Sequence, residues 1–199
     1  MKILRERLRT SKGEIFGWVV DNFVSKDVCR ELIDAAKPKL KPSTTLEPVV
    51  ENYRTSSNTF LYYNRGIGAV DKVASLVTDI IDLPLVNCEG MQVVHYNSGE
   101  YYKPHHDYFH AETSYWEREM ARGGQRIWTA FLYLNDVSEG GSTSFPNINV
   151  EVKPKAGRIV LWLNVLGKRL NTDSYHEAKP PIDCEKWGAN IWVREGIFK

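Results

Sequence analysis

The first half of the chain carries the apolar spacing of helices. Apolar side chains recur every four positions up to Ala36, and Ser25 just before them is a good helix N-cap. A second helical spacing runs from Val70 to Ile81. Residues 41–58 are rich in Pro, Ser, Thr and Asn and predict a loop. This half is therefore expected to supply two helices.

After residue 87 the pattern changes to short β-rich runs. The predicted strands, including an early one, are 15–20, 92–96, 127–134, 150–153, 158–163 and 190–193. Many short strands separated by turn signals predict a sandwich or barrel, and the two helices can cover one sheet face. We therefore expect one mainly β domain over residues 1–199, in which residues 1–87 support a core over 88–199.

Charge and hydropathy exclude some classes of partner. The 199 residues include 26 Lys+Arg and 25 Asp+Glu, and this balance argues against a nucleic-acid partner held by overall charge. No apolar run approaches the ~20 residues of a membrane helix, and the charged start lacks the apolar segment of a signal peptide. We expect a cytoplasmic protein with no nucleic-acid or membrane partner, or a lumenal one if the sequence is a piece of a longer chain.

The three cysteines, Cys29, Cys88 and Cys184, lie far apart and form no C-x-x-C motif. This spacing argues against a zinc ribbon and against a thioredoxin-type redox site. An odd count fits a reducing compartment, and one disulfide with one free thiol is the alternative.

One histidine cluster in the strand-rich half indicates a metal site. On an extended segment His105 and Asp107 point to the same face, because side chains two apart do so. His176 is the distant downstream histidine that can add a third ligand. Two histidines and one carboxylate on one side of a metal form the facial triad of non-haem Fe(II) oxygenases. Ordinary hydrogen-bonded histidines are the alternative.

A lysine downstream of the histidines indicates the electron source such an oxygenase needs. If that source is 2-oxoglutarate, its distal carboxylate must meet a buried cation, because a desolvated carboxylate without a partner is costly. Lys186 follows His176 by ten positions and precedes Trp187. Thr143 and Tyr96 are candidate hydroxyl donors to the same carboxylate. The alternative for Lys186 is a solvated surface charge.

Longer motifs add a family resemblance. They are, in order, Tyr96-Asn97-x-Gly99-x-Tyr101-Tyr102-x-Pro104-His105-x-Asp107-Tyr108, then Gly123-Gly124-Gln125-Arg126, then Tyr133-Leu134-Asn135-Asp136-Val137-x-Glu139-Gly140-Gly141-x-Thr143-x-Phe145-Pro146, then His176 and Lys186-Trp187. Over roughly residues 14–199 the chain resembles the catalytic domain of collagen-type prolyl 4-hydroxylases, which are 2-oxoglutarate- and Fe(II)-dependent dioxygenases. The resemblance implies a double-stranded β-helix, or jelly-roll, with supporting helices.

The resemblance also implies a role for each matching residue. Fe(II) would bind His105, Asp107 and His176, and the C5 carboxylate of 2-oxoglutarate would pair with Lys186. The co-substrate site would include Thr143, Tyr96 and Thr129, and the substrate proline would lie near Glu89, Tyr102, Arg126 and Trp192. The implied enzyme uses O2 to hydroxylate C4 of proline in proline-rich peptides or proteins, releases succinate and CO2, and takes ascorbate as reductant. A monomer or a homodimer is expected.

Two departures from the family pattern border the predicted site. Glu177-Ala178-Lys179-Pro180 follows the distal histidine, where the family commonly has small residues and a Cys-Pro pair, and Arg194 stands where the family has a histidine. These changes put the peptide preference in doubt, not the chemistry.

Aromatic residues and long loops predict how a peptide is held. Tyr102 and Trp192 can form a flat apolar slot for a pyrrolidine ring. Residues 41–66 and 109–124 lack clear periodicity, and we expect both to flank the peptide groove and to be mobile without ligand.

Three other functions fit the same residues. The chain can be a 2-oxoglutarate oxygenase that acts on another protein residue, a free amino acid or a nucleic-acid base. It can also be a non-catalytic peptide-binding relative, or a structural jelly-roll that binds zinc at the same three ligands.

Overall fold

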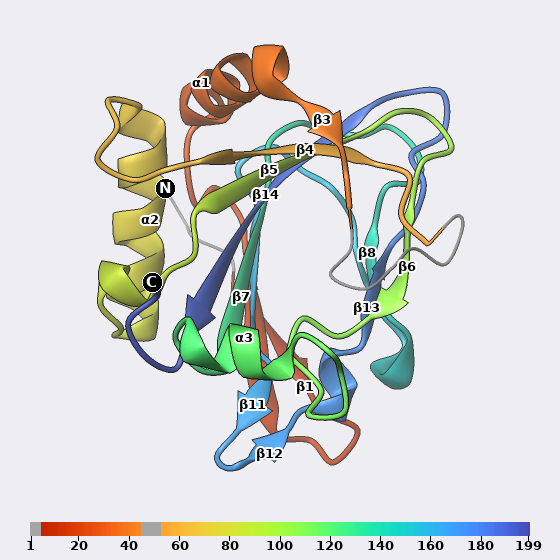
Figure 1. The fold of residues 1–199 in the computed structure, drawn as a ribbon. Coiled ribbons are helices and arrows are strands. Elements are labelled where there is room, and N and C mark those ends of the chain that lie inside the picture. Colours follow the sequence, from red (N-terminus) through yellow and green to blue (C-terminus); the bar gives the residue numbers. More distant parts are fainter. Residues whose placement is uncertain (1–4, 45–52) are drawn as a thin grey trace.

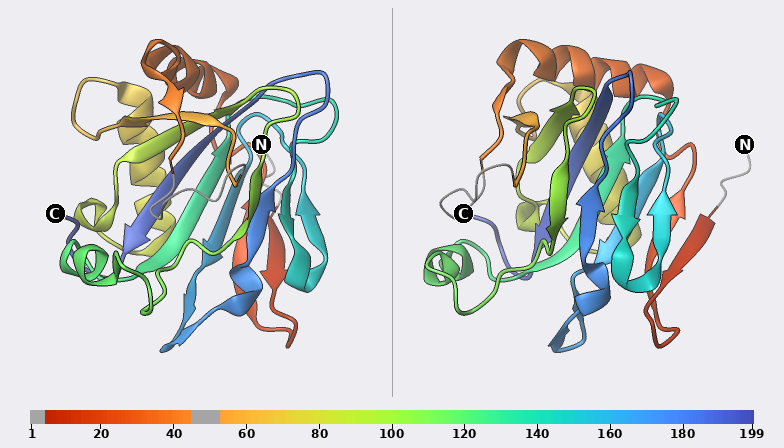
Figure 2. Two further views of the ribbon diagram at one scale, coloured as in Figure 1. Left: turned by 45° about the vertical axis from the view of Figure 1, so that its right-hand side comes forward. Right: turned by 90° about the vertical axis from the view of Figure 1, so that its right-hand side faces the viewer.

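The computed structural model describes residues 5–44 and 53–199, which form two packed β-sheets with two long helices on one outer face (Figures 1 and 2). The helices are α1 (Lys26–Ala36), α2 (Gly68–Ile81) and α3 (Trp116–Ala121). The strands of the large sheet are β1 (Arg5–Arg9), β2 (Ile15–Val20), β3 (Lys41–Pro42), β4 (Ser57–Leu61), β5 (Met91–Tyr96), β7 (Arg126–Tyr133), β10 (Ile159–Leu163) and β14 (Lys186–Arg194). The small sheet contains β6 (Tyr102–His105), β8 (Thr143–Phe145), β9 (Val150–Val152) and β13 (His176–Ala178), and β11 (Val165–Leu166) and β12 (Arg169–Leu170) form a separate hairpin.

The strand order crosses between sheets as in a jelly-roll. The large sheet runs β1-β2-β10-β7-β14-β5-β4-β3 and the small one β6-β13-β8-β9, with antiparallel neighbours throughout. From β5 to β14 the chain passes repeatedly between two facing sheets, and the residues between the sheets form the interior. The predicted fold class, mainly β with supporting helices in a double-stranded β-helix, is confirmed.

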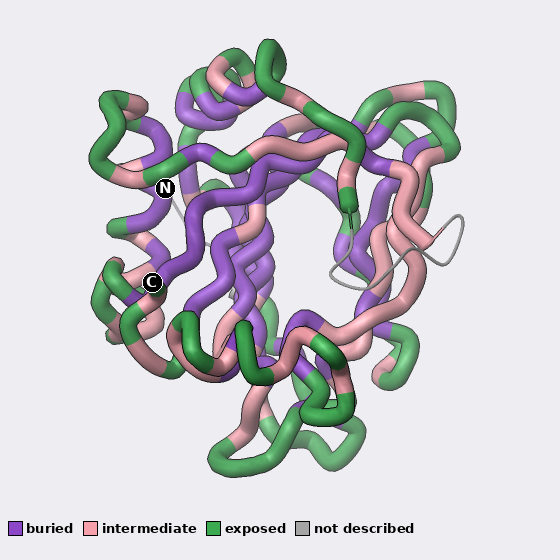
Figure 3. Tube along the Cα trace, in the orientation of Figure 1, coloured by how far each residue is buried: buried purple, intermediate pink, exposed green. Residues whose placement is uncertain are grey.

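The two long helices cover the outer face of the large sheet, as predicted (Figure 1). Ser25 caps α1 by accepting a hydrogen bond from the backbone N–H of Val28 at 3.4 Å. Leu32 of α1 and Val70 and Val77 of α2 are fully buried in one core cluster with the sheet. Figure 3 shows the same arrangement, with purple central strands and green outer helix turns.

The central strands are buried on both faces, so alternate side chains enter two different cores. On β7, Leu132 packs in the helix-side cluster, whereas Phe131 and Tyr133 pack in the cluster between the sheets. On β14, Trp187 and Ile191 face the helices. The positions that alternate with them, from Lys186 to Arg194, therefore share the face toward the small sheet.

Several predicted loops contain regular structure. The 41–58 loop begins with β3 and runs into β4, whose polar sequence pairs with β5 without an apolar alternation to reveal it. The small sheet was missed except for β9, because its strands are three or four residues long and several carry polar side chains. The part of the 41–66 prediction over residues 45–52 lies outside the described residues.

The cysteine thiols are free: Cys29 and Cys88 are buried in the helix-side core and Cys184 is half-buried. The sequence alternative of one disulfide is therefore not realised in the structure. Within residues 5–44 and 53–199, no helix has the length and apolar content needed to cross a membrane.

Candidate active site

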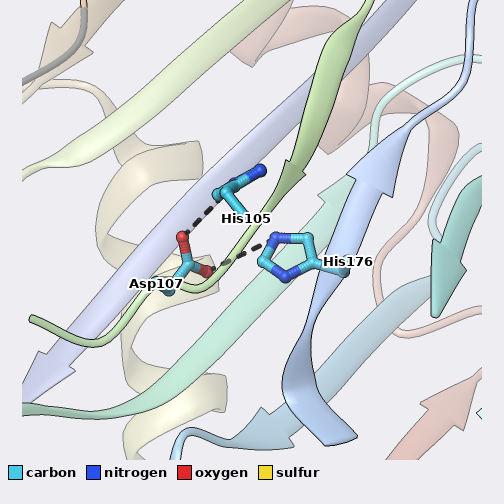
Figure 4. A group of neighbouring side chains, drawn as sticks. All are labelled: His105, Asp107 and His176. Atoms are coloured by element: carbon cyan, nitrogen blue, oxygen red, sulfur yellow. Dashed lines mark ion pairs between the residues drawn. The ribbon is translucent and has the colours of Figure 1, made fainter. Parts of the chain in front are cut away.

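Three side chains from two neighbouring strands converge at the mouth between the sheets (Figure 4). His105 ends β6 and His176 begins β13, and the two residues are directly paired in the small sheet. Asp107 lies in the bend just after β6, so the segment is not extended through it as the sequence argument assumed. The three residues converge as predicted, with Asp107 in a bend instead of on an extended strand.

Backbone hydrogen bonds orient both imidazoles in the same way. His105 Nδ1 lies 2.8 Å from the carbonyl oxygen of Lys103, and His176 Nδ1 lies 2.9 Å from that of Ser174. A proton on each Nδ1 satisfies these carbonyls and leaves both Nε2 atoms as acceptors facing Asp107, at 3.8 and 3.7 Å. Burial, with a smaller contribution from His176, lowers the pKa of His105 to about 3, so this imidazole is neutral at pH 7.

The carboxylate of Asp107 is buried and oriented from behind. Burial would raise its pKa, but His176, His105, Arg126 and a hydrogen bond from Thr129 outweigh burial and hold the pKa below its ordinary value. Thr129 donates to Oδ2 of Asp107 at 2.7 Å. The hydroxyl of Thr129 in turn accepts from the side-chain amide of Asn164 at 2.8 Å. Thr129 was predicted to line the co-substrate site, and in the structure its hydroxyl holds the carboxylate.

These donors fit one metal ion. One imidazole nitrogen from each histidine and a carboxylate oxygen of Asp107 all lie within 4.8 Å of one another. Two imidazole nitrogens and one carboxylate oxygen on one side leave the opposite side for exogenous ligands, which is the donor set of non-haem Fe(II). The hydrogen bonds to the second imidazole nitrogens are typical support for metal-binding histidines.

Lys186 lies at the start of β14 with its ammonium group fully buried. Among the described residues its Nζ has no hydrogen-bond partner. The rings of Tyr96, Phe131 and Tyr133 surround it, with centroids 5.2, 5.3 and 5.5 Å from Nζ. Burial lowers the pKa of Lys186 from 10.5 to about 7. A buried cation without a counter-ion is costly, so this position fits an anionic ligand that supplies the missing charge.

The predicted hydroxyl donors stand on the strands around Lys186. Thr143 Oγ1 is buried and lies 2.7 Å from the hydroxyl of Tyr133. Tyr96 is paired with Lys186 across β5 and β14, and its hydroxyl bonds Ser56 and Arg54. Tyr133 was not predicted as a hydroxyl donor near Lys186. The available signal was its spacing of two from Phe131, which places both side chains on the same face of the strand.

A pocket of about 580 Å³ opens over His105 and Asp107. Tyr102, Arg126 and Trp192 line it, as expected for residues near a substrate. Tyr102 stacks on His105 with ring centroids 3.7 Å apart and planes at 20°. Trp192 is 7% exposed, and the indole nitrogen is buried without a partner among the described residues.

Both predicted loop regions border this pocket. Phe60 and Asn58 line it from the 41–66 region, and His110 and Tyr115 line it from the 109–124 region. The second region also contains α3, which is too short for a helical apolar repeat. That the two regions flank the pocket is confirmed, and their mobility stays a prediction.

Glu89 lies behind the pocket and does not line it. Its carboxylate accepts two hydrogen bonds from Arg126, at 2.6 and 2.8 Å. Arg126 in turn lies over the ring of Trp192, with Cζ 3.9 Å from the centroid. Direct contact between Glu89 and a substrate stays a prediction, whereas its contact with Arg126 is part of the structure.

The jelly-roll, the donor set and the buried lysine define a class of protein. A facial set of two histidines and one carboxylate at the mouth of such a fold is typical of non-haem Fe(II) oxygenases. The ammonium group of Lys186 is buried in the same fold and has no hydrogen-bond partner among residues 5–44 and 53–199.

Comparison with known proteins agrees with this class. The family model of the 2OG-Fe(II) oxygenase superfamily matches residues 91–194. An Arabidopsis thaliana protein named "Probable prolyl 4-hydroxylase 10" is 33% identical over 94% of this chain and 73% of its own length. The chain belongs to the prolyl 4-hydroxylases of the 2OG-Fe(II) oxygenase superfamily and is an oxidoreductase.

Two solved structures share the fold. A viral collagen prolyl hydroxylase from Paramecium Bursaria Chlorella virus-1, solved as a 2OG complex, has a TM-score of 0.73, is 26% identical and matches 90% of this chain and 96% of its own. A prolyl hydroxylase in complex with a hypoxia inducible factor oxygen degradation domain peptide fragment from Trichoplax adhaerens has a TM-score of 0.64. It is 19% identical, matches 90% of this chain and 83% of its own, and supports the fold alone.

Proposed function

We propose that this protein hydroxylates C4 of prolyl residues in a peptide or protein, using Fe(II), 2-oxoglutarate and O2, and that the chain acts as one catalytic unit. The observation that carries the proposal is the position of the pocket. An aromatic-lined pocket of about 580 Å³ opens directly over two of the three candidate metal ligands. Aromatic grooves of this kind suit proline-rich segments, whose polyproline II backbone is already ordered.

The candidate metal ligands have separate tasks. Fe(II) would be held by Nε2 of His105, Nε2 of His176 and the carboxylate of Asp107. Together with 2-oxoglutarate the metal supplies oxidative decarboxylation and activation of O2, which no protein side chain can supply. Thr129 holds the Asp107 carboxylate in place through its 2.7 Å hydrogen bond. The backbone carbonyls at Lys103 and Ser174 hold the two imidazoles.

Lys186 would bind the C5 carboxylate of 2-oxoglutarate. The ammonium group contributes the charge, and the hydroxyls of Thr143 and Tyr133 lie on neighbouring strand positions of the same interior. The surrounding rings exclude water, which strengthens the ion pair that forms. By anchoring the C5 carboxylate, Lys186 would set the position of the keto-acid end relative to the candidate metal ligands.

The pocket walls would hold the peptide. The ring of Tyr102, stacked flat on His105, offers an apolar face close to the metal ligands for a pyrrolidine ring. The indole N–H of Trp192, which has no partner among the described residues, and the guanidinium group of Arg126 would donate to carbonyl groups of the peptide backbone. A polyproline II segment exposes such carbonyls because it has no internal hydrogen bonds.

Turnover of a defined peptide tests the proposal. Purified protein with Fe(II), ascorbate, 2-oxoglutarate and (Pro-Pro-Gly)10 is expected to form succinate and to add the mass of one oxygen to the peptide, with the new hydroxyl at C4 by fragmentation and amino-acid analysis. His176→Ala removes one candidate ligand and is expected to abolish both products. The matched control is His110→Ala, which changes a histidine that lines the pocket outside the metal group. This variant should still form succinate from 2-oxoglutarate when no peptide is added. Oxygen on another residue, or turnover by His176→Ala, contradicts the proposal.

A further inference from the structure

Arg194, at the end of β14, has its whole side chain buried in a network of charged groups. Its Nε donates to Glu89 at 2.6 Å and its Nη2 to the Glu119 carboxylate at 2.8 Å. Its Nη1 donates to the backbone carbonyls of Glu119, at 3.1 Å, and Gly124, at 2.7 Å. Every nitrogen of the guanidinium group therefore has an acceptor, and the side chain is fully buried and does not line the pocket.

One side of this network anchors the segment of residues 109–124, which contains α3. Glu119 lies within α3 and is 2% exposed. Burial would raise its pKa, but hydrogen bonds from Arg194 and Arg118 and the charge of Arg122 outweigh it, so the carboxylate is ionised. Arg194 thus binds both the side chain and the backbone of a helix of only six residues, which is too short to be stable alone.

The other side of the network reaches the pocket. Glu89 receives Nε of Arg194 on the same carboxylate that binds Arg126 twice. The guanidinium group of Arg126 stacks on the ring of Trp192, and both residues line the pocket. Phe109 lies between the two arginines, with ring centroid 4.9 Å from Arg126 Cζ and 4.5 Å from Arg194 Cζ. A continuous set of contacts therefore joins α3 to the pocket floor.

We propose that Arg194 is a positioning residue for the peptide, which fixes the 109–124 segment and the Arg126–Trp192 pair relative to each other without touching the substrate. This inference rests on the proposed function, because it assumes a peptide in the pocket. A buried charge network contributes little net stability, but its hydrogen bonds permit few alternative arrangements. The expected role is therefore precision of the peptide site and not stability of the fold.

Arg194→Met removes the link between the two sides of the network and leaves the other ion pairs in place. Glu89 keeps Arg126, and Glu119 keeps Arg118 and Arg122, at 3.1 and 3.4 Å, so no buried carboxylate loses its last cation. Arg194→Lys keeps the charge but cannot make the same four hydrogen bonds. This variant should therefore recover part of the peptide turnover that Arg194→Met loses.

Arg158→Met is the matched control. Arg158 binds Asp21 at 2.6 Å, and Asp21 keeps Lys155 at 2.9 Å when Arg158 is lost. This variant removes an arginine that also binds a carboxylate and a backbone carbonyl but is less deeply buried than Arg194, and Arg158 does not line the pocket.

Two readouts separate positioning from a general loss of structure. Hydrogen–deuterium exchange of the metal-free protein is expected to become faster in residues 109–124 of Arg194→Met and to stay unchanged there in Arg158→Met. With (Pro-Pro-Gly)10, kcat/KM for the peptide is expected to fall about 10- to 100-fold, as for misplacement by about 1 Å, with partial recovery in Arg194→Lys. The KM for 2-oxoglutarate is expected to stay within about twofold, because Lys186 lies at the other end of β14.

Three results would overturn the inference. They are unchanged exchange in residues 109–124, an equal loss of peptide turnover in Arg158→Met, and a parallel rise in the KM for 2-oxoglutarate. If the wild-type protein turns over no peptide, the proposed function fails, and the exchange experiment still decides whether Arg194 anchors the segment.

Discussion

Replacing Lys186 by Met tests the buried cation directly, because the change removes a charge and keeps an unbranched side chain of similar length. Burial lowers the Lys186 pKa from 10.5 to about 7, which corresponds to about 5 kcal/mol at 1.36 kcal/mol per tenfold change. We therefore expect Lys186→Met to raise the free energy of unfolding by several kcal/mol, at most about 5 kcal/mol, at pH 6.5.

The gain in stability should depend on pH with a definite sign. Between pH 7 and 10.5 the unfolded chain keeps a proton on Lys186 that the folded protein has released, so raising the pH removes the penalty from the wild type. The difference between the two proteins should be full below pH 7 and should decline toward zero by about pH 10.5. Urea unfolding of both metal-free proteins at pH 6.5 and 9 measures it. Lys155→Met, at an exposed lysine whose partner Asp21 keeps Arg158, should change stability by less than about 1 kcal/mol.

The same variant should lose its co-substrate. Binding of the C5 carboxylate requires the ammonium form, so wild-type affinity for 2-oxoglutarate should weaken as the pH rises above 7, where binding must also take up a proton. Anaerobic calorimetry of the metal-loaded proteins should show at least about 100-fold weaker binding by Lys186→Met, as for the loss of a buried charge pair. A variant that is no more stable than wild type at pH 6.5, or that keeps 2-oxoglutarate affinity, refutes the reasoning.

Three further substitutions probe the surroundings of the site. Thr129→Val removes the hydrogen bond to Asp107 and keeps the shape of the side chain. It should weaken Fe(II) binding about 10-fold in anaerobic equilibrium dialysis. Unchanged affinity would show that the bond does not orient the carboxylate. Tyr102→Ala should raise the peptide KM about 10-fold in steady-state assays, whereas Tyr102→Phe should not, because the ring face is the contacting surface. Equal effects of the two substitutions would argue that the hydroxyl makes the contact instead. Gly188→Ala would place a Cβ 2.3 Å from Cζ of Phe131 and should lower the free energy of unfolding by about 1–3 kcal/mol in urea titrations, so a neutral effect would show that the Phe131 ring moves freely.

The central strands of the large sheet and the two long helices were predictable because their apolar spacing is strong. The 70–81 repeat gives α2, and the runs over 92–96 and 127–134 give β5 and β7 almost to the residue. These elements bury at least one full face, so burial dictates the residue types. The small sheet was hard to predict for the opposite reason. The short strands β6 and β13 carry His105 and His176. Side chains that serve as candidate ligands interrupt the apolar–polar alternation by which a strand is predicted.

The candidate site was predictable as residues but not as a set of contacts. The spacing of His105 and Asp107, with a distant histidine and lysine, indicated the four central side chains. Nothing in the sequence showed that Asn164 supports Thr129, because that hydrogen bond joins β7 to a residue 35 positions away. Arg194 was visible as a departure from the family pattern, but its two carboxylate partners lie 75 and 105 positions away, and only the fold brings them together.

Metal analysis after anaerobic equilibrium dialysis against Fe(II) addresses the shared coordination of one ion by three side chains. The wild-type protein is expected to retain one Fe(II) per chain. His105→Ala, Asp107→Ala and His176→Ala are each expected to lose tight binding, because two remaining donors hold the ion weakly, and His110→Ala is expected to retain it. Full retention of Fe(II) by any of the three ligand variants, or its loss in His110→Ala alone, would contradict the assignment of the metal centre.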